Sequence, residues 1–210
     1  MKVLVIASHI DDEVLGCGGT IKRHTKKGDQ VFVVFISSKY SKRFDEALVN
    51  TRKAHAKKAA DVLGIQEIFF AEYPLIMLDT IPQLDIVTSL ERIIFELKPE
   101  VLYCHYDSDM NSDHRIVSQA AMVWCRPSKT PFLKKVLFYE IFASTKKFEP
   151  NYYVDITNEI EDKLAALSVY STENNAQTRT LDTSRLVAAY RGAEINTAYA
   201  EAFYLYREIV

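Results

Sequence analysis

The chain has 210 residues, of which 48% are hydrophobic, and its 26 basic and 28 acidic residues nearly cancel. This length and composition suit one sizeable core, and no Pro-, Gly- or Ser-rich linker divides the sequence, so we expect a single domain over residues 1–210. The balanced charge, without a Lys/Arg stripe interleaved with aromatic residues, makes nucleic acid a poor candidate partner. Since no apolar run approaches the roughly 18 residues of a transmembrane helix, we expect a cytoplasmic protein with no transmembrane segment.

The cysteines, Cys17, Cys104 and Cys125, are odd in number and have no Cys-x-x-Cys spacing. A disulfide framework needs paired cysteines at regular spacings. We therefore expect reduced thiols, and we expect Cys17 and Cys104 to be buried and inert rather than nucleophilic.

Strands alternate with helices along the first two thirds of the chain. Residues 2–7 form a continuous, largely β-branched run of the kind that is buried on both faces of a parallel sheet. Similar strand signals recur at residues 31–36, 67–70, 101–104 and 135–139. Helical patterns cover residues 18–27, 44–63, 84–97 and 115–124. This alternation predicts βαβ units and a largely parallel sheet covered by helices.

The pattern changes after Pro150. Residues 154–157 have the pattern of a short strand, and residues 159–170 and 181–190 have that of helices. The aromatic-rich segment 199–206 fits either core packing or a subunit contact in a homo-oligomer, and the sequence does not choose between them.

The loop after the first strand, residues 7–13, places one imidazole shortly before three consecutive acids. Open α/β sheets bind ligands at the carboxyl ends of their strands, and adjacent carboxylates repel unless a cation or a proton compensates them. His9 and Asp12 are close enough in sequence to bind one ion, and His114, which opens a later helix, is the best third ligand. Two histidines and one carboxylate form a catalytic zinc set with a position left for water. Either histidine alone would be interpreted as structural.

The neighbouring acids have different predicted roles. If Asp12 binds the metal, Asp11 can take a proton from the attacking water, so we predict that Asp11 is the general base. Without a metal, Asp11 would be a cap of the following helix. Glu13 is expected to act as a cap or to pair with a nearby base. Asp113, beside His114, is expected to hydrogen-bond a ligand imidazole, to transfer a proton or to cap its helix.

The glycine-rich run from Gly16 to Thr20 suggests nucleotide binding, but Ile21 stands where the dinucleotide fingerprint needs its third glycine. Acids also precede the run, where a pyrophosphate needs positive potential. We therefore expect these glycines to allow close packing of the first helix behind the metal. Arg52, in a predicted helix, is either a clamp for a polar substrate group or a solvated charge.

The motifs resemble those of the LmbE-like, or PIG-L, family of zinc-dependent N-deacetylases. Residues 9–20 and 109–115 carry the resemblance, which extends in weaker segments over nearly the entire chain. It implies a Rossmann-like three-layer α/β/α fold with a mostly parallel central sheet. It also implies metal ligation by His9, Asp12 and His114, with Zn²⁺ as the expected ion and Fe²⁺ as an alternative. Further implications are a general base at Asp11 and a substrate contact at Arg52.

Two positions depart from the family pattern. Ile10 replaces the usual proline of the first motif, and Asn111 replaces the first histidine of a His-Pro-Asp-His motif, which in other members stabilises the oxyanion and protonates the leaving amine. An amide can donate a hydrogen bond but cannot act as a general acid at neutral pH. The leaving-group acid is therefore open between His105, Asp113 and the reprotonated Asp11. Either Asn111 or His105 is expected to assist the oxyanion.

The sequence thus predicts a metal-dependent hydrolase that removes an N-acetyl group from an amino sugar or a sugar-bearing molecule. Within this family, the chain more closely resembles the branch that has asparagine in the second motif. That branch is often associated with surface-polysaccharide sugars. One alternative is a metal-dependent amidase that acts on a non-sugar conjugate. Another is an inactive metal-binding or sugar-binding domain, for which Asn111 is the only support.

Overall fold

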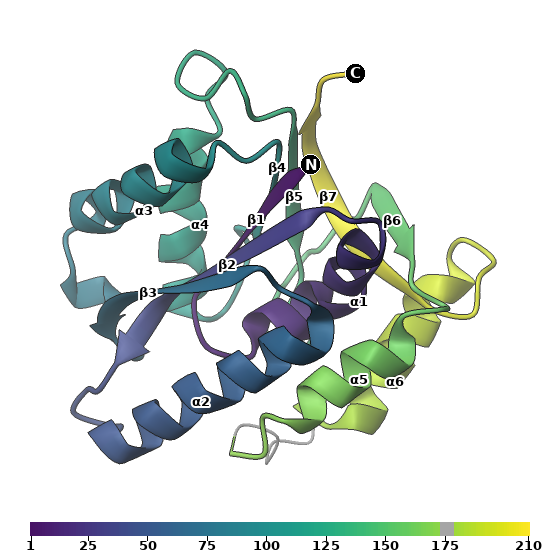
Figure 1. Ribbon diagram of the computed structural model, residues 1–210, viewed down its shortest axis with the longest axis horizontal. Helices are drawn as coiled ribbons and strands as arrows, with labels where there is room; N and C mark the ends of the chain where they lie inside the picture. Colours follow the sequence, from purple (N-terminus) through teal and green to yellow (C-terminus); the bar gives the residue numbers. More distant parts are fainter. Residues whose placement is uncertain (173–178) are drawn as a thin grey trace.

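The computed structural model describes residues 1–172 and 179–210 and arranges them around one seven-stranded sheet with the order β3-β2-β1-β4-β5-β7-β6 (Figure 1). The first five strands are parallel: β1 (Lys2–Ala7), β2 (Gln30–Lys39), β3 (Glu67–Pro74), β4 (Val101–His105) and β5 (Lys135–Tyr139). β7 (Ala200–Glu208) is antiparallel to both β5 and the edge strand β6 (Tyr152–Asp155). The predicted mostly parallel sheet is confirmed.

Helices cover both faces of the sheet (Figure 1). One face packs against α1 (Asp12–Lys26), α2 (Glu46–Leu63) and α5 (Ile160–Ser168). The other packs against α3 (Gln83–Leu97), α4 (Ser112–Trp124) and the 3-10 turn η1 (Leu78–Thr80). The helix α6 (Leu181–Ala193) packs on α5 and β7. These layers form the predicted Rossmann-like α/β/α arrangement.

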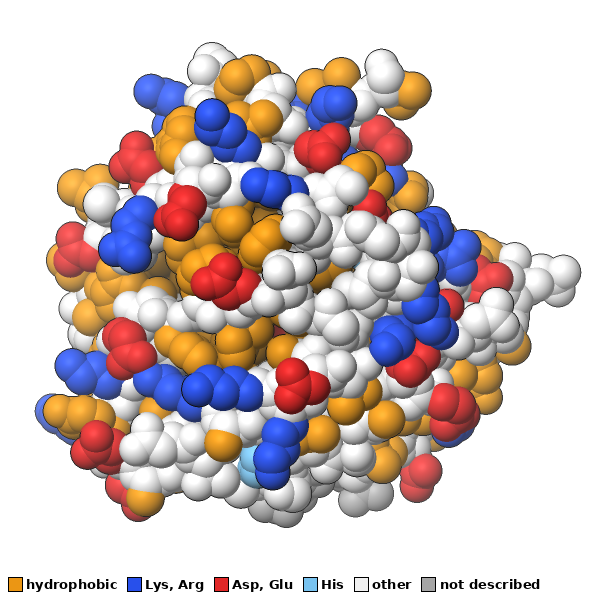
Figure 2. All heavy atoms as spheres, in the orientation of Figure 1, with side chains coloured by type: hydrophobic (Ala, Val, Ile, Leu, Met, Phe, Trp, Pro, Cys, Tyr) orange, Lys and Arg blue, Asp and Glu red, His pale blue; other side chains and the backbone are white. Residues whose placement is uncertain are grey.

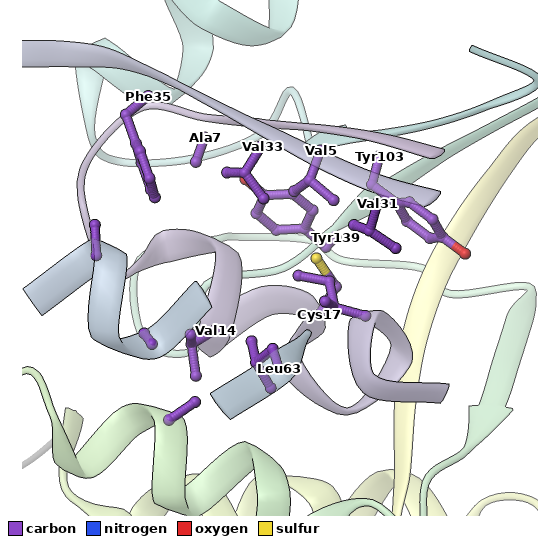
Figure 3. Close-up of a cluster of buried hydrophobic side chains, with 14 of the residues drawn as sticks. Val5, Ala7, Val14, Cys17, Val31, Val33, Phe35, Leu63, Tyr103 and Tyr139 are labelled. Atoms are coloured by element: carbon purple, nitrogen blue, oxygen red, sulfur yellow. The ribbon is translucent and has the colours of Figure 1, made fainter. Parts of the chain in front are cut away.

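The strands build both cores because successive side chains of a strand point to opposite faces of the sheet. In β1, Val3, Val5 and Ala7 face α1 and α2, whereas Leu4 and Ile6 face α3 and α4. Figure 3 shows the first core, in which side chains of β1 and β2 meet Val14 and Cys17 of α1 and Leu63 of α2. Burial on both faces fixes the register of β1 and hence the position of the loop that follows it.

The first helix begins earlier than the glycine-rich sequence suggested. We expected a helix from residue 18, but α1 starts at Asp12 and is kinked at Cys17, where φ is −148° and ψ is 26°. The backbone N–H groups of Gly19 and Thr20 donate to the Glu201 carboxylate at 2.9 and 2.7 Å. Lys163 of α5 pairs with the same carboxylate at 2.6 Å. A distant strand therefore supplies the hydrogen-bond acceptor that the broken helix needs, and this cannot be read from the local sequence.

Gly16 allows the first turn of α1 to lie directly against β5. A Cβ atom at this position would come within 2.2 Å of the Tyr139 ring, which is fully buried and hydrogen-bonded through its hydroxyl to the Ile6 carbonyl at 2.9 Å. We expect Gly16→Ala to lower the free energy of unfolding by about 1–3 kcal/mol, because overpacking of a rigid core outweighs the better helix propensity of alanine. Chemical denaturation measures this change, and an unchanged midpoint would show that the ring can move aside.

The C-terminal third contains a strand that we did not predict. The segment 199–206 largely forms β7, in which Ala200, Ala202 and Phe203 are buried, so core packing is the alternative that the structure supports. The expected strand at 154–157 lies two residues earlier, at β6, because it pairs with β7 from Tyr152 to Asp155. Both differences depend on a long-range pairing.

The visible surface agrees with the balanced charge of the sequence, and the cysteines agree with the expectation of reduced thiols. Figure 2 shows Lys/Arg and Asp/Glu side chains interspersed around hydrophobic side chains on the visible face. Cys17, Cys104 and Cys125 are free and buried, as expected for the first two. Within residues 1–172 and 179–210, no helix is both long and apolar enough to cross a membrane.

Candidate metal centre

The loop after β1 is held in place by its own acidic side chains. The backbone N–H of His9 donates to Asp12 Oδ2 at 2.8 Å, and that of Asp11 donates to Glu13 Oε2 at 3.2 Å. The other Glu13 oxygen accepts a hydrogen bond from the Tyr170 hydroxyl. Of the two roles that we considered for Glu13, the structure shows the cap: its carboxylate accepts from the backbone N–H of Asp11, the N-cap residue of α1, and its other bond in the described part of the chain is to a phenol rather than to a base. Burial raises its pKa to about 8.

Three side chains, one from the loop after β1 and two from the first turns of α1 and α4, meet at the carboxyl ends of β1 and β4. His114 Nε2 is 3.2 Å from His9 Nδ1 and 3.4 Å from Asp12 Oδ2, and His9 Nδ1 is 3.3 Å from the same oxygen. Asp12 and His114 are fully buried, whereas the His9 side chain retains 10% exposure, so solvent reaches the cluster beside His9. The structure therefore brings together the three residues that we predicted as metal ligands.

The spacing of these atoms fits a tetrahedral metal ion. Zinc binds nitrogen and oxygen at about 2.0–2.2 Å, which implies separations of roughly 3.3–3.6 Å between tetrahedral ligand atoms. The three observed separations, 3.2, 3.3 and 3.4 Å, are close to this range. In addition, Asp12 Oδ1 is buried without a hydrogen-bond partner among the described residues. A buried carboxylate oxygen in this state is compensated by a cation.

Each predicted ligand histidine has a carboxylate behind it. His9 Nε2 is 3.0 Å from Asp113 Oδ2, and His114 Nδ1 is 3.1 Å from Asp109 Oδ2. Such outer carboxylates fix the tautomer and the orientation of a metal-binding imidazole. The contact of Asp113 is one of the roles that we considered for it, but we assigned no role to Asp109. Its position five residues before His114 was the available signal.

The cluster attracts positive charge. Burial lowers the pKa of His114, but Asp12 and Asp109 outweigh this effect and raise it to about 10. Burial also opposes protonation of His9, yet hydrogen bonds to Asp113 and Asp12 raise its pKa. His114 is therefore protonated at neutral pH in the metal-free cluster, and the raised pKa of His9 favours a second proton there.

This protonation predicts proton release on metal binding. Because metal binding requires neutral imidazoles, we expect the protein to release between about one and two protons per zinc ion at pH 7, and its zinc affinity to rise with pH. Calorimetric titration in buffers of different ionisation enthalpy gives the proton count. A count of zero would mean that both imidazoles are already neutral in the metal-free protein.

Asp11 has a strained backbone beside the cluster. Its φ of 120° and ψ of −23° are rare for any residue other than glycine. Its side chain is 1% exposed, and its Oδ2 accepts a hydrogen bond from Arg179 Nη1 at 2.8 Å. Strain of this kind is concentrated at functional sites. We did not predict the contact with Arg179, because no spacing in the sequence links residues so far apart.

His105 lies behind Asp12 and not at the surface of the site. Its Nε2 accepts a hydrogen bond from the Ser8 backbone N–H at 2.9 Å, and its ring stacks on His114 at 4.1 Å between centroids. The side chain is fully buried, and burial and the neighbouring His114 lower its pKa to about 4. The predicted role of leaving-group acid finds no support in this placement.

Asn111 caps α4. Its Oδ1 accepts a hydrogen bond from the Asp113 backbone N–H at 2.9 Å, so the cap that we considered for Asp113 belongs to Asn111. Because this bond uses the amide oxygen, the amide nitrogen is the group that can still donate to a substrate. Arg52 lies on α2 with its guanidinium 5.0 Å from the centroid of the Phe44 ring.

Known proteins are similar to this chain in sequence and in fold. The profile of the family PIG-L, described as GlcNAc-PI de-N-acetylase, matches residues 4–125. "Uncharacterized deacetylase YaiS" of Escherichia coli (strain K12) is 28% identical over 179 residues, which cover 81% of this chain and 90% of that protein.

Two solved structures superimpose over almost the whole chain. The conserved protein TT1542 from Thermus thermophilus has a TM-score of 0.82 at 22% identity, with 99% of this chain and 96% of that chain covered. N,N'-diacetylchitobiose deacetylase from Pyrococcus horikoshii has a TM-score of 0.80 at 26% identity, with 98% of this chain and 84% of that chain covered.

These matches define the class of the protein, which is a deacetylase. The chain belongs to the PIG-L family, as its two motifs predicted.

Proposed function

We propose that this deacetylase hydrolyses the N-acetyl group of an amino sugar or a sugar-bearing molecule, with zinc bound by His9, Asp12 and His114. The observation that carries the proposal is the triangle of ligand atoms with separations of 3.2–3.4 Å, next to the strained Asp11. The sugar is supported by the similarity to the Pyrococcus enzyme, whose name identifies diacetylchitobiose as its substrate. Zinc is supported by the donor set of two imidazoles and one carboxylate.

Asp11 is the proposed general base. When bound, zinc would polarise the acetamide carbonyl and acidify the attacking water. Asp11 neighbours a ligand in sequence and is held by Arg179, so its carboxylate is positioned to accept a proton from that water. The protonated Asp11 would then supply the proton to the leaving amine. This second role is favoured because Asp11 already receives the proton of the water, whereas His105 is bonded to the Ser8 backbone and Asp113 to the His9 imidazole.

Asn111 is the proposed donor to the oxyanion, and Arg52 is the proposed contact to a polar group of the substrate. The amide nitrogen of Asn111 can donate while its oxygen keeps α4 capped. His105 would act indirectly: it packs against His114 and lies 3.4 Å from Asp12 Oδ2, so it positions two ligands.

The role of Asn111 can be separated from its role as a cap. We expect Asn111→Ala to lower kcat by about a hundredfold at unchanged metal content, as for the loss of one oxyanion donor. Asn111→Ser keeps a good N-cap with a shorter side chain, so it should restore stability but not turnover. Steady-state kinetics and thermal denaturation of both variants decide the matter. Full recovery of kcat in the serine variant would show that Asn111 acts only through the helix.

A substrate panel tests the proposed function. Acetate release by the zinc-loaded protein would be measured with free, glycan-linked, nucleotide-linked and lipid-linked N-acetyl sugars, and with N-acetylated amines that lack a sugar. We expect turnover of at least one sugar conjugate and little turnover of the simple amides. Comparable turnover of simple amides would favour the amidase alternative, and no turnover of any compound would favour an inactive binding domain.

We also propose that residues 1–210 act as one catalytic domain in the cytoplasm. One sheet uses strands from both ends of the chain, and Glu201 of β7 supports α1 beside the metal centre. The free buried cysteines fit a reducing compartment. Assembly into a homo-oligomer stays a prediction that sedimentation analysis can test.

A further inference from the structure

A cavity lies on the α4 side of the sheet, lined by residues of α4, β5, β7 and the segment that follows β4. It measures about 210 Å³, and none of the three metal ligands lines it. Its walls are aromatic: Tyr106 meets Tyr204 edge to face at 5.7 Å, and Phe138 meets Tyr206 in the same manner at 6.0 Å between ring centroids. The rings therefore enclose a space for a small group and present several π faces.

One polar atom in the cavity lacks a partner. Ser118 of α4 lines the cavity and is fully buried, and its Oγ makes no hydrogen bond to any described residue. A buried hydroxyl without a partner has lost its hydrogen bonds to water and is destabilising. A ligand that donates a hydrogen bond at this depth would satisfy it.

The charged residue that lines the cavity is an acid. Asp107 is exposed at the rim, and no lysine or arginine of the described residues lines the cavity. Burial, followed by the charges of Asp107 and Glu149, raises the pKa of Tyr106, so both acids act on this ring. Arg115 and Lys146 lie outside this cavity, in an adjoining pocket that Asp107 also lines, and the Arg115 guanidinium there donates to the Asp109 carbonyl.

We propose that this cavity binds a small molecule with a protonated primary amine. Aromatic faces attract cations, Asp107 supplies the opposite charge, and Ser118 Oγ accepts a hydrogen bond from the ammonium group. An anion would find no lysine or arginine among the described residues that line the cavity, and a purely apolar molecule would leave Ser118 unsatisfied. The assignment does not depend on the metal or on the deacetylase reaction.

The experiment compares two ring-sized probes that differ mainly in charge, cyclohexylammonium and cyclohexanol. Saturation-transfer NMR titration of the intact protein at pH 7 measures each dissociation constant. We expect cyclohexylammonium to bind in the millimolar range and cyclohexanol to bind at least tenfold more weakly. Treatment with a chelator should leave the binding unchanged, which separates this cavity from the metal centre.

Variants locate the binding. Asp107→Asn and Tyr206→Ala should each weaken cyclohexylammonium binding about fivefold to tenfold. The matched control is Tyr40→Ala, which removes a tyrosine that is 51% exposed, compared with 48% for Tyr206, and that lies outside the cavity. This control should not change the affinity.

Ser118→Ala separates an effect on ligand affinity from an effect on stability, because it should weaken cyclohexylammonium binding severalfold without lowering Tm. The removed hydroxyl has no partner among the described residues of the unliganded protein, so its loss should not destabilise the fold. Equal affinity for both probes, no binding, or unchanged affinity in Asp107→Asn and Tyr206→Ala would overturn the proposal. A change in oligomeric state in these two variants would also overturn it, since a second copy would then cover the cavity.

Discussion

Replacing His9, Asp12 or His114 by alanine is expected to remove bound metal and deacetylase activity together. A site with three protein ligands has none to spare. A metal bound there would contribute several kcal/mol of transition-state stabilisation, so kcat should fall by roughly a thousandfold or more in each variant. The three variants should behave alike, because their ligand atoms lie within 3.2–3.4 Å of one another in one cluster. Elemental analysis and acetate release measure the two effects on the same sample.

Two comparisons make this result specific. Asp109→Asn and Asp113→Asn alter the carboxylates behind the ligand histidines, and such changes typically reduce metal affinity or activity by only about 10–100-fold. His24→Gln is the matched control, because His24 also bonds a carboxylate, Asp29 at 2.7 Å, but lies at the C-terminal end of α1. It should keep full metal content. Full occupancy in all three ligand variants would rule out the assigned site.

The sequence predicted those features that depend on local pattern. The β-branched run of β1 and the stop signals of the helices were sufficient for the parallel part of the sheet. The carboxyl ends of parallel strands lie at one edge, so His9 and His114 could be placed together although 105 residues separate them. The metal cluster was thus predictable from topology and residue type.

The features that were missed depend on distant partners. Glu201 accepts hydrogen bonds from Gly19 and Thr20 across 182 and 181 residues, and this contact satisfies the N–H groups that follow the kink of α1 at Cys17. Arg179 reaches Asp11 across 168 residues. Each contact is one long side chain meeting one partner group. Such a pair leaves no periodicity or spacing in the sequence, whereas a strand or a helix does.

Asp11→Asn is expected to retain the metal and lose most of its turnover. The amide has nearly the same shape, so the loop and its ligands should be preserved, but it cannot accept a proton from the attacking water. Loss of a general base lowers kcat by about 10²–10⁴-fold. A larger loss within this range fits the proposal that Asp11 also protonates the leaving amine. Near-normal kcat at neutral pH with full zinc content would assign the base to another residue.

Asp11→Gly separates the chemical role of Asp11 from its backbone strain. Both Asp11 variants should be inactive, but only glycine adopts a φ of 120° without strain. Relief of strain is worth about 1–3 kcal/mol. Loss of the contact with Arg179, whose side chain is 32% exposed, should offset only a small part of this gain. In zinc-loaded protein we therefore expect the glycine variant to have a Tm about 2–4 °C above that of the asparagine variant. A lower Tm would mean that the loop holds Asp11 without strain. A higher Tm in an inactive variant would show that the fold accepts a less stable backbone to keep a carboxylate beside the metal centre.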